Sequence, residues 1–215
     1  TDLIMGNIGE NFYLRPNKEN PVKLWLNDFD QSGTMDQFLT RTVDKRDMPV
    51  FLKREITEQF PALKKGNLKH SEYAKKSIRD LFSKELISQS ATKTFNYCQS
   101  VVAINEGNGK FTIQPLPQQT QLSSVNAIAI TDLNGDKRPD ILSGGNLYNF
   151  PPQFGRLDAG YGHVLMNEGN SKLTYLEPEV SGILIRGEVK DIKVIGGYIV
   201  AAVNNDKPVV LQVKK

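Results

Sequence analysis

Two acidic segments of nine residues constrain the fold of this chain more than any other feature. The first, DFDQSGTMD, runs from Asp28 to Asp36, and the second, DLNGDKRPD, runs from Asp132 to Asp140. Oxygen-bearing side chains stand at positions 1, 3, 5 and 9 of both, and position 7 can add a backbone carbonyl. These positions hold Asp28, Asp30, Ser32, Thr34 and Asp36 in the first segment and Asp132, Asn134, Asp136, Arg138 and Asp140 in the second. Alternating oxygen donors in a tight turn can converge on calcium, which takes about six to eight oxygen ligands.

The spacing resembles the start of an EF-hand loop, but the rest of the pattern differs. An EF-hand carries a glutamate at position 12 and a helix on each side. Position 12 is Leu39 after the first segment and Ser143 after the second. The flanking segments VKLWLN, QFLTRTV, VNAIAIT and ILSGGN are short, apolar and rich in β-branched residues, which is typical of strands.

Two strand–acidic turn–strand units are therefore predicted. An Asx-rich hairpin without metal is the alternative interpretation of each, because Asp, Asn and Gly favour turns by themselves. The second turn carries three carboxylates and an asparagine, whereas the first has Ser32 at position 5. We therefore expect tighter calcium binding at the second turn.

The chain also contains an internal repeat. INEGNGKFTIQPLP, from Ile104 to Pro117, matches MNEGNSKLTYLEPE, from Met166 to Glu179. The second acidic turn lies between these copies, so one repeat reads as strand, acidic turn, strand, long loop, strand, glycine turn and strand. Four antiparallel strands in one repeat predict a blade of a β-propeller.

Two further segments extend this repeat. After Pro178, VKDIKVI, YIVAAVN and PVVLQVKK read as three strands, and the turn Ile195-Gly196-Gly197 replaces the acidic loop, so we expect no metal there. At the other end, TDLIMGN aligns with PDILSGGN from Pro139, which makes Asp2 position 9 of an acidic turn. We therefore expect a chain truncated within a motif, and the absence of a leader segment then says little about localisation.

Residues 51–94 interrupt the strand pattern. Their apolar residues recur at helical spacing, with Tyr73, Ile78, Leu81 and Phe82 on one face. Ser71 is the expected N-cap of this helix, Pro61 and Gly66 separate it from an earlier one, and a short third helix is expected from Lys84 to Gln89. This helical insertion either forms a partner surface or only caps the sheet.

These patterns predict a mainly β fold: a partial β-propeller of about three four-stranded antiparallel blades with an α-helical insertion. All 215 residues would form one propeller fragment. The predicted divisions are the end of a truncated blade at 1–20, a blade at 21–118 with the insertion at 51–94, a blade at 119–179, and a degenerate last blade at 180–215.

Composition narrows the function classes. The net charge of +3 argues against nucleic-acid binding, and a single cysteine, Cys98, excludes an intrachain disulfide. Two scattered histidines make a zinc site improbable. No apolar run approaches the roughly 20 residues of a membrane span.

The acidic turns, the helical insertion and the segment PQFGRLDAGYGHVLMNEG together resemble the FG-GAP/VCBS repeats of integrin α-subunit propellers and of bacterial surface proteins that carry an ASPIC/UnbV domain. The resemblance covers most of the chain and is weak after Gly187. It implies a seven-bladed parent propeller, structural calcium at the turn positions given above, and an extracellular or cell-envelope location. The chain departs from the family pattern where Ser32 and Asn134 replace the commoner aspartate and Lys137 replaces a glycine.

The preferred hypothesis is a non-catalytic, calcium-binding module that recognises a protein or glycan at the cell surface. A carbohydrate-active enzyme is the first alternative, with its site in the loop that holds Phe154, Arg156, Asp158, Tyr161 and His163. Arg156 could position an acidic substrate and His163 could transfer protons, although an Arg156–Asp158 ion pair that merely orders the loop explains the same residues. The loop aromatics could stack on sugar rings or pack on their own blade. Self-association through exposed blade edges is the second alternative.

Overall fold

The protein is mainly β. The structure is a computed structural model that describes residues 1–213, with Pro152 described by its backbone alone. Four antiparallel sheets hold 38% of the residues, and helices hold 17%. The predicted fold class, a mainly β chain with open, blade-like sheets, is confirmed. The chain divides into two compact units: unit 1 comprises Thr1–Tyr13 and Cys98–Lys215, and unit 2 comprises Leu14–Tyr97. Within the described residues, no helix is long and apolar enough to cross a membrane.

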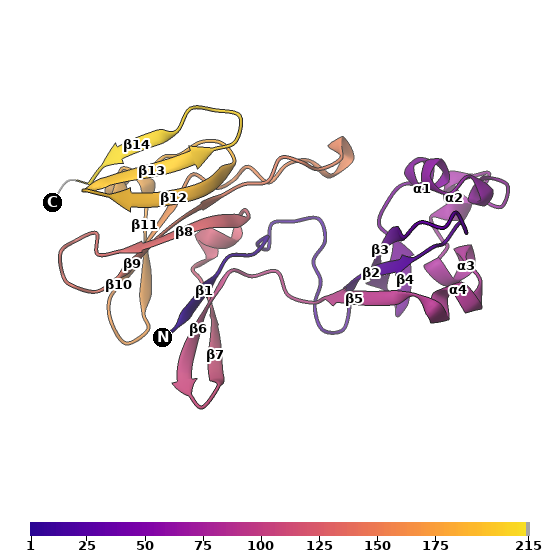
Figure 1. Ribbon diagram of the computed structural model, residues 1–215, viewed down its shortest axis with the longest axis horizontal. Coiled ribbons are helices and arrows are strands. Elements are labelled where there is room, and N and C mark those ends of the chain that lie inside the picture. The colour runs from indigo at the N-terminus through magenta and orange to yellow at the C-terminus, as the bar shows by residue number, and fades with distance from the viewer. Residues whose placement is uncertain (214–215) are drawn as a thin grey trace. The chain divides into compact units, whose positions relative to one another are not determined.

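The central sheet of unit 1 is a four-stranded antiparallel meander, ordered β11-β10-β9-β8 (Figure 1). Its strands are β8 (Val125–Thr131), β9 (Asp140–Gly145), β10 (His163–Asn167) and β11 (Leu173–Leu176). They lie within the predicted 119–179 repeat and follow one another in the predicted order. The second acidic turn joins β8 to β9, so Thr131 pairs directly with Asp140.

Unit 1 has two more sheets of three strands each, which we call the first sheet and the third sheet. The first sheet is ordered β1-β6-β7, and the third sheet is ordered β12-β13-β14. Their bounds are β1 (Leu3–Met5), β6 (Val101–Gly107), β7 (Lys110–Pro115), β12 (Val189–Ile195), β13 (Tyr198–Val203) and β14 (Val209–Gln212). Ile195 pairs with Tyr198 across the predicted Gly196-Gly197 turn.

The first sheet corrects the predicted boundaries. Strands β6 and β7 were expected to close a blade that spans 21–118, but they pair with β1, with Leu3 opposite Ala103. Residues 14–97 are therefore inserted as a whole between two neighbouring strands of one sheet. Local patterns identify strands, but they do not determine which distant strands pair, and this is where the predicted division fails.

The three sheets of unit 1 pack face to face. Val102, Ile4 and Ile104 of the first sheet cluster with Ile141 and Leu165 of the central sheet. The opposite face of the central sheet, which includes Leu142 and Val164, packs on the third sheet through a second cluster. That cluster includes Ile192, Ile199, Ala201, Leu211 and the connecting residues Ile183 and Ile185. Short helices connect the strands: η2 (Gln118–Gln121), η3 (Pro152–Phe154) and α5 (Pro178–Ser181).

Unit 2 is a four-stranded sheet, ordered β4-β3-β2-β5, with short helices between β4 and β5. Its strands are β2 (Val22–Asn27), β3 (Asp36–Val43), β4 (Arg46–Pro49) and β5 (Ala91–Phe95). The last strand pairs with β2 and not with β4, with Trp25 opposite Thr92. Unit 2 therefore lacks the sequential order of the central sheet in unit 1.

The helical segment follows the prediction in outline. Its elements are α1 (Lys53–Gln59), η1 (Pro61–Lys64), α2 (His70–Tyr73), α3 (Ile78–Leu81) and α4 (Lys84–Gln89). The single helix expected after Ser71 is instead two short ones, because Asp80 accepts hydrogen bonds from both the N–H and the hydroxyl of Ser77 and so starts a new helix there. The predicted apolar face packs with the buried residues Trp25, Phe29, Phe38, Ile56 and Phe60.

Candidate metal-binding turns

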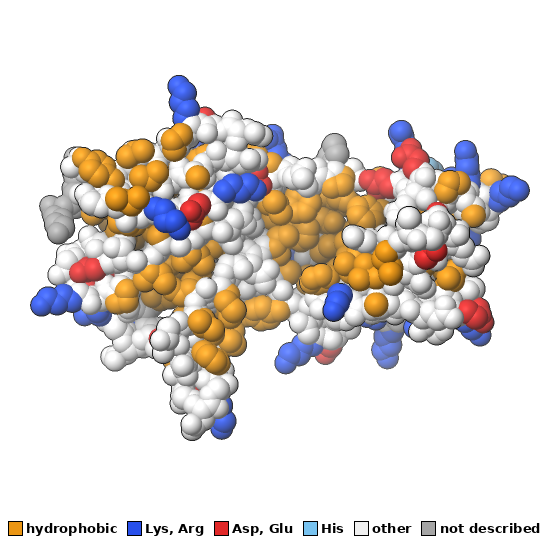
Figure 2. Space-filling view, viewed as in Figure 1, with side chains coloured by type: hydrophobic (Ala, Val, Ile, Leu, Met, Phe, Trp, Pro, Cys, Tyr) orange, Lys and Arg blue, Asp and Glu red, His pale blue; other side chains and the backbone are white. Residues whose placement is uncertain are grey.

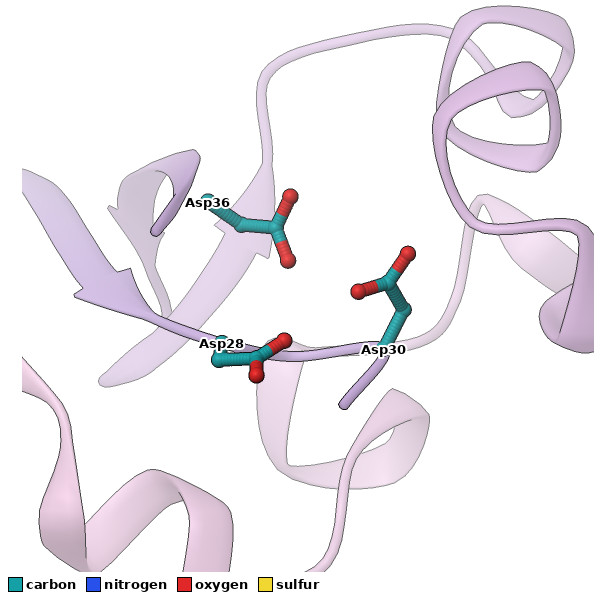
Figure 3. A group of neighbouring side chains, drawn as sticks. All are labelled: Asp28, Asp30 and Asp36. Atoms are coloured by element: carbon teal, nitrogen blue, oxygen red, sulfur yellow. The ribbon is translucent and has the colours of Figure 1, made fainter. Parts of the chain in front are cut away.

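The first acidic turn links β2 to β3 in unit 2. Asp28 follows the last residue of β2, and Asp36 begins β3. One carboxylate oxygen from each of Asp28, Asp30 and Asp36 lies within 4.8 Å of the others. Figure 3 shows the three carboxylates turned toward a shared space at the end of the hairpin. None of the three forms an ion pair in the described part of the chain.

Backbone N–H groups hold these carboxylates in place, most clearly the first and the last. Asp28 accepts hydrogen bonds from the N–H of Ser32 at 2.9 Å and from the N–H of Gly33 at 2.8 Å. Asp36 accepts one from the N–H of Phe29 at 3.0 Å. Gly33 has φ of +87°, a conformation that glycine adopts without steric cost. The turn therefore wraps around its first and ninth side chains.

The side chains at positions 3, 5 and 7 are exposed and polar. Asp30 accepts a hydrogen bond from the N–H of Ser32 at 3.1 Å, and the hydroxyls of Ser32 and Thr34 lie 2.8 Å apart. The pKa of Asp30 lies below its ordinary value, chiefly because of its hydrogen bond with the Ser32 side chain. Asp30 is thus ionised at neutral pH, as a calcium ligand must be.

The second acidic turn has a similar pattern of hydrogen bonds from backbone N–H groups to its carboxylates. Asp132 accepts hydrogen bonds from the N–H groups of Gly135 at 2.7 Å and Lys137 at 2.9 Å. Asp140, at position 9, accepts one from the N–H of Leu133 at position 2, as Asp36 does from Phe29. The predicted equivalence of the two segments is therefore visible in their hydrogen bonds.

The middle of the second turn differs because protein donors already surround its carboxylate. Asp136 accepts a hydrogen bond from Asn134 Nδ2 at 2.9 Å and forms an ion pair with Arg138 Nη2 at 2.5 Å. The pKa of Asp136 is lowered, first by the backbone N–H of Arg138 and then by Asn134. Arg138 also donates from Nε to the carbonyl of Asn167 at 2.7 Å, which anchors its guanidinium beside the turn.

The ion pair between Arg138 and Asp136 affects which of the two turns should bind calcium more tightly. Tighter calcium binding at the second turn stays a prediction, but the geometry favours the first. A guanidinium beside Asp136 repels a divalent cation and occupies a lone pair that the cation needs. The three acidic residues of the first turn have no such partner among the residues that the structure describes.

The ninth position has a structural role that the sequence interpretation missed. Asp140 is fully buried, and its second oxygen accepts the N–H of Asn167 at 2.8 Å. Asp2 accepts the N–H of Asn105 at the equivalent place in the first sheet, also at 2.8 Å. The repeated NEGN motif was the available signal, because its asparagine recurs beside each of these aspartates.

The residues of the loop proposed as an alternative catalytic site have separate neighbours. Phe154 stacks on Tyr13 with ring centroids 4.2 Å apart, and Arg156 lies over the ring of Tyr148 at 5.2 Å. Tyr161 is 42% exposed, and Asp158 is exposed with no ion pair to Arg156 in the described structure. Phe154 thus packs onto its own unit, whereas Tyr161 is partly open to solvent.

His163, the remaining member of that loop, begins strand β10 and is 6% exposed. Burial lowers its pKa to about 4, so its imidazole is neutral at physiological pH. Its Nδ1 has no hydrogen-bond partner among the described residues, and its ring centroid lies 5.9 Å from that of Tyr175. This placement within the sheet core gives it no access to a substrate from solvent.

No family model, curated protein or solved structure matches the chain. The resemblance to FG-GAP/VCBS repeats therefore stays a prediction from the sequence.

Proposed function

We propose that the protein is a calcium-binding module in which the first acidic turn, at the β2–β3 hairpin of unit 2, is the principal metal site. The observation that carries this proposal is the approach of Asp28, Asp30 and Asp36 to within 4.8 Å without a basic partner. Three carboxylates held this close repel one another, and a divalent cation between them removes that repulsion. Oxygen-only donors in an exposed turn suit calcium better than a transition metal.

The proposed role of calcium is structural. The turn is held by hydrogen bonds from backbone N–H groups, and an ion that bridges positions 1, 3 and 9 would also tie the end of β2 to the start of β3. Because the site is exposed, we expect a dissociation constant of about 0.1–1 mM, as in extracellular calcium modules. A site of this affinity would fill only where calcium is millimolar, so the proposal includes an extracellular or cell-envelope location.

The module would act by recognising a protein or glycan and not by catalysis. Supporting this role, the histidine of the alternative loop site is buried, and its arginine lies over the ring of Tyr148. The resemblance to FG-GAP/VCBS surface proteins points the same way.

A calcium titration of metal-stripped protein tests the proposal. Trp25 is the only tryptophan in the chain, lies on β2 next to the turn and is 6% exposed, so its fluorescence reports on this hairpin alone. We expect a saturable change in fluorescence with a midpoint of about 0.1–1 mM calcium and a weaker response to magnesium. Calorimetry on the same samples gives the number of sites.

Matched variants identify the turn. Asp30→Asn removes one charge from the first turn and should weaken binding by about tenfold. Asp136→Asn, at position 5, likewise removes one charge from the second turn and should leave the Trp25 response unaltered. If neither heat nor fluorescence changes at about 10 mM calcium, well above the expected affinity range, the proposal is wrong.

A further inference from the structure

One face of the first sheet in unit 1 exposes apolar side chains on its two outer strands, while Val101 and Ala103 of the middle strand are buried on that face. Residues opposite one another in neighbouring antiparallel strands share a face, so Leu3, Ala103 and Ile113 lie in one row. Met5, two residues after Leu3, and Phe111, two residues before Ile113, lie on the same face on either side of this row. Leu3 and Ile113 are each 48% exposed, Met5 44% and Phe111 42%. We refer to Leu3, Met5, Phe111 and Ile113 as the first-sheet face.

The central sheet shows what covers this kind of face. Because Asp2 matches Asp140 and Asn105 matches Asn167 in their hydrogen bonds, the two sheets can be compared position by position. Leu3 then corresponds to Ile141, and the pair Ala103–Ile113 corresponds to Leu165–Tyr175.

In the central sheet these positions are covered. Ile141 is 3% exposed, Leu165 is fully buried, and Tyr175 is half-buried. The first sheet covers them by packing its opposite face, with Ile4, Val102 and Ile104, against them. The first-sheet face thus has the composition of a surface that, one repeat later, a neighbouring sheet buries.

The same chain carries a free sheet face at its other end. One face of the third sheet packs on the central sheet through Ile192, Ile199 and Leu211. Its other face presents Ile195, 64% exposed, Tyr198, 46% exposed, and Val210, 58% exposed. The charged side chains of that face, Asp191 and Lys193, pair with each other at 3.2 Å, so covering it buries no unpaired charge. We refer to this as the third-sheet face.

We propose that the first-sheet face is an interaction surface for a second copy of this chain, which packs its third-sheet face on it. The first sheet packs on the central sheet, and the central sheet on the third, so this contact would continue a stacking order that unit 1 uses twice internally. The contact is head-to-tail, because two different faces meet. Exposed apolar patches of this kind commonly mark interaction sites, and Figure 2 shows hydrophobic side chains gathered at the base of the β6–β7 hairpin.

Two variants, one for each face, test the proposal. Ile113→Lys places a charge on the first-sheet face, and Val210→Lys places one on the third-sheet face. Both positions are about half exposed, so the variants should fold, which circular dichroism verifies. Leu68→Lys, at a side chain of unit 2 that is 74% exposed, is the matched control for the change in surface charge.

Sedimentation velocity of the full chain over a roughly hundredfold range of concentration gives the readout. The wild type and Leu68→Lys should show a mass that rises with concentration. Ile113→Lys and Val210→Lys should each weaken association by at least about tenfold, because each desolvates a lysine in the contact.

Mixing the two variants decides the geometry. Ile113→Lys keeps its third-sheet face and Val210→Lys keeps its first-sheet face, so an equimolar mixture should form dimers and nothing larger. The proposal is overturned if the wild type keeps the mass of one chain at the highest concentration. It is equally overturned if Val210→Lys alone still associates like the wild type, since the first-sheet face would then pair with itself or with another surface.

Discussion

The two acidic hairpins, one in each unit, share a backbone design and differ in charge balance. In both, the first aspartate accepts backbone N–H groups from the middle of the turn, and the ninth accepts the N–H of the second residue. In the β8–β9 turn, Arg138 neutralises the central carboxylate and Asp140 is buried. In the β2–β3 turn, three carboxylates face one another near the surface.

This difference shows that an acidic motif has two separable parts. Positions 1 and 9 shape the turn through hydrogen bonds in both hairpins. We expect the charge of the middle positions to determine whether the turn also binds a cation. A sequence match to the motif therefore predicts the turn more securely than it predicts the ion.

The largest expected difference between the hairpins is in the stability of the metal-free protein. Asp140→Asn should lower the free energy of unfolding of unit 1 by about 3 kcal/mol. The NH2 group of the new asparagine would face the buried N–H of either Leu133 or Asn167, and that N–H would lose its acceptor. Asp36→Asn should lower the free energy of unfolding of unit 2 by about 1 kcal/mol, since Asp36 accepts one backbone N–H and is only partly buried.

Urea unfolding in the presence of a chelator measures both changes. Far-UV circular dichroism follows the strands, most of which lie in unit 1, and Trp25 fluorescence follows unit 2. Equal losses of stability from the two substitutions would show that the ninth position has the same role in both hairpins, contrary to this comparison.

The second expected difference is in pH dependence. The pKa of His163 is about 4 in the folded protein and about 6.5 when unfolded. The unfolded chain therefore binds a proton more readily, and unit 1 should lose stability as the pH falls below 6.5. The loss should reach about 3 kcal/mol by pH 4. Unfolding midpoints of unit 1 at a series of pH values provide the measurement.

His163→Gln cannot take up the proton and should remove most of this slope between pH 6.5 and 5. His70→Gln, an exposed position in unit 2, is the matched control and should leave the slope of unit 1 unchanged. A wild-type slope that persists in His163→Gln would assign it to other groups.

The smallest expected effect concerns calcium at the second turn. Arg138→Gln removes the cation beside Asp136 and should raise calcium affinity there by about fivefold, a modest gain because the pair is partly exposed. Calorimetry on a protein that also carries Asp30→Asn isolates the second turn. Unchanged or weaker binding would mean that Arg138 does not cause the expected difference in calcium affinity between the two hairpins.

Much of the local structure could be predicted from the sequence. Alternation of apolar residues and the acidic turns located β2, β3, β8 and β9, and the NEGN repeat located the strands on either side of it. The alignment of Asp2 with Asp140 also identified two equivalent positions, although it did not predict the hydrogen bonds that both form. These successes share a cause, since strand period and turn chemistry are set by neighbouring residues.

Features that depend on distant partners were not predicted. Nothing near Val101 indicates that it pairs with Met5 across the whole of unit 2. The ranking of the two turns counted carboxylates along the sequence and did not weigh the guanidinium of Arg138. The enzyme alternative included His163 as a group that could transfer protons, because its burial depends on the packing of a sheet that the sequence does not display.

The way in which the chain enters and leaves unit 2 has an evolutionary consequence. On the unit 1 side, the N–H of Gly9 donates to the carbonyl of Cys98 at 2.8 Å, and on the unit 2 side, Val22 pairs with Phe95. Both units therefore hold the outgoing and returning segments next to each other. An inserted domain whose two ends lie close together can be exchanged, lengthened or deleted at little entropic cost to the domain that carries it. We therefore expect this junction to tolerate changes in the inserted domain during evolution without a change in the fold of unit 1.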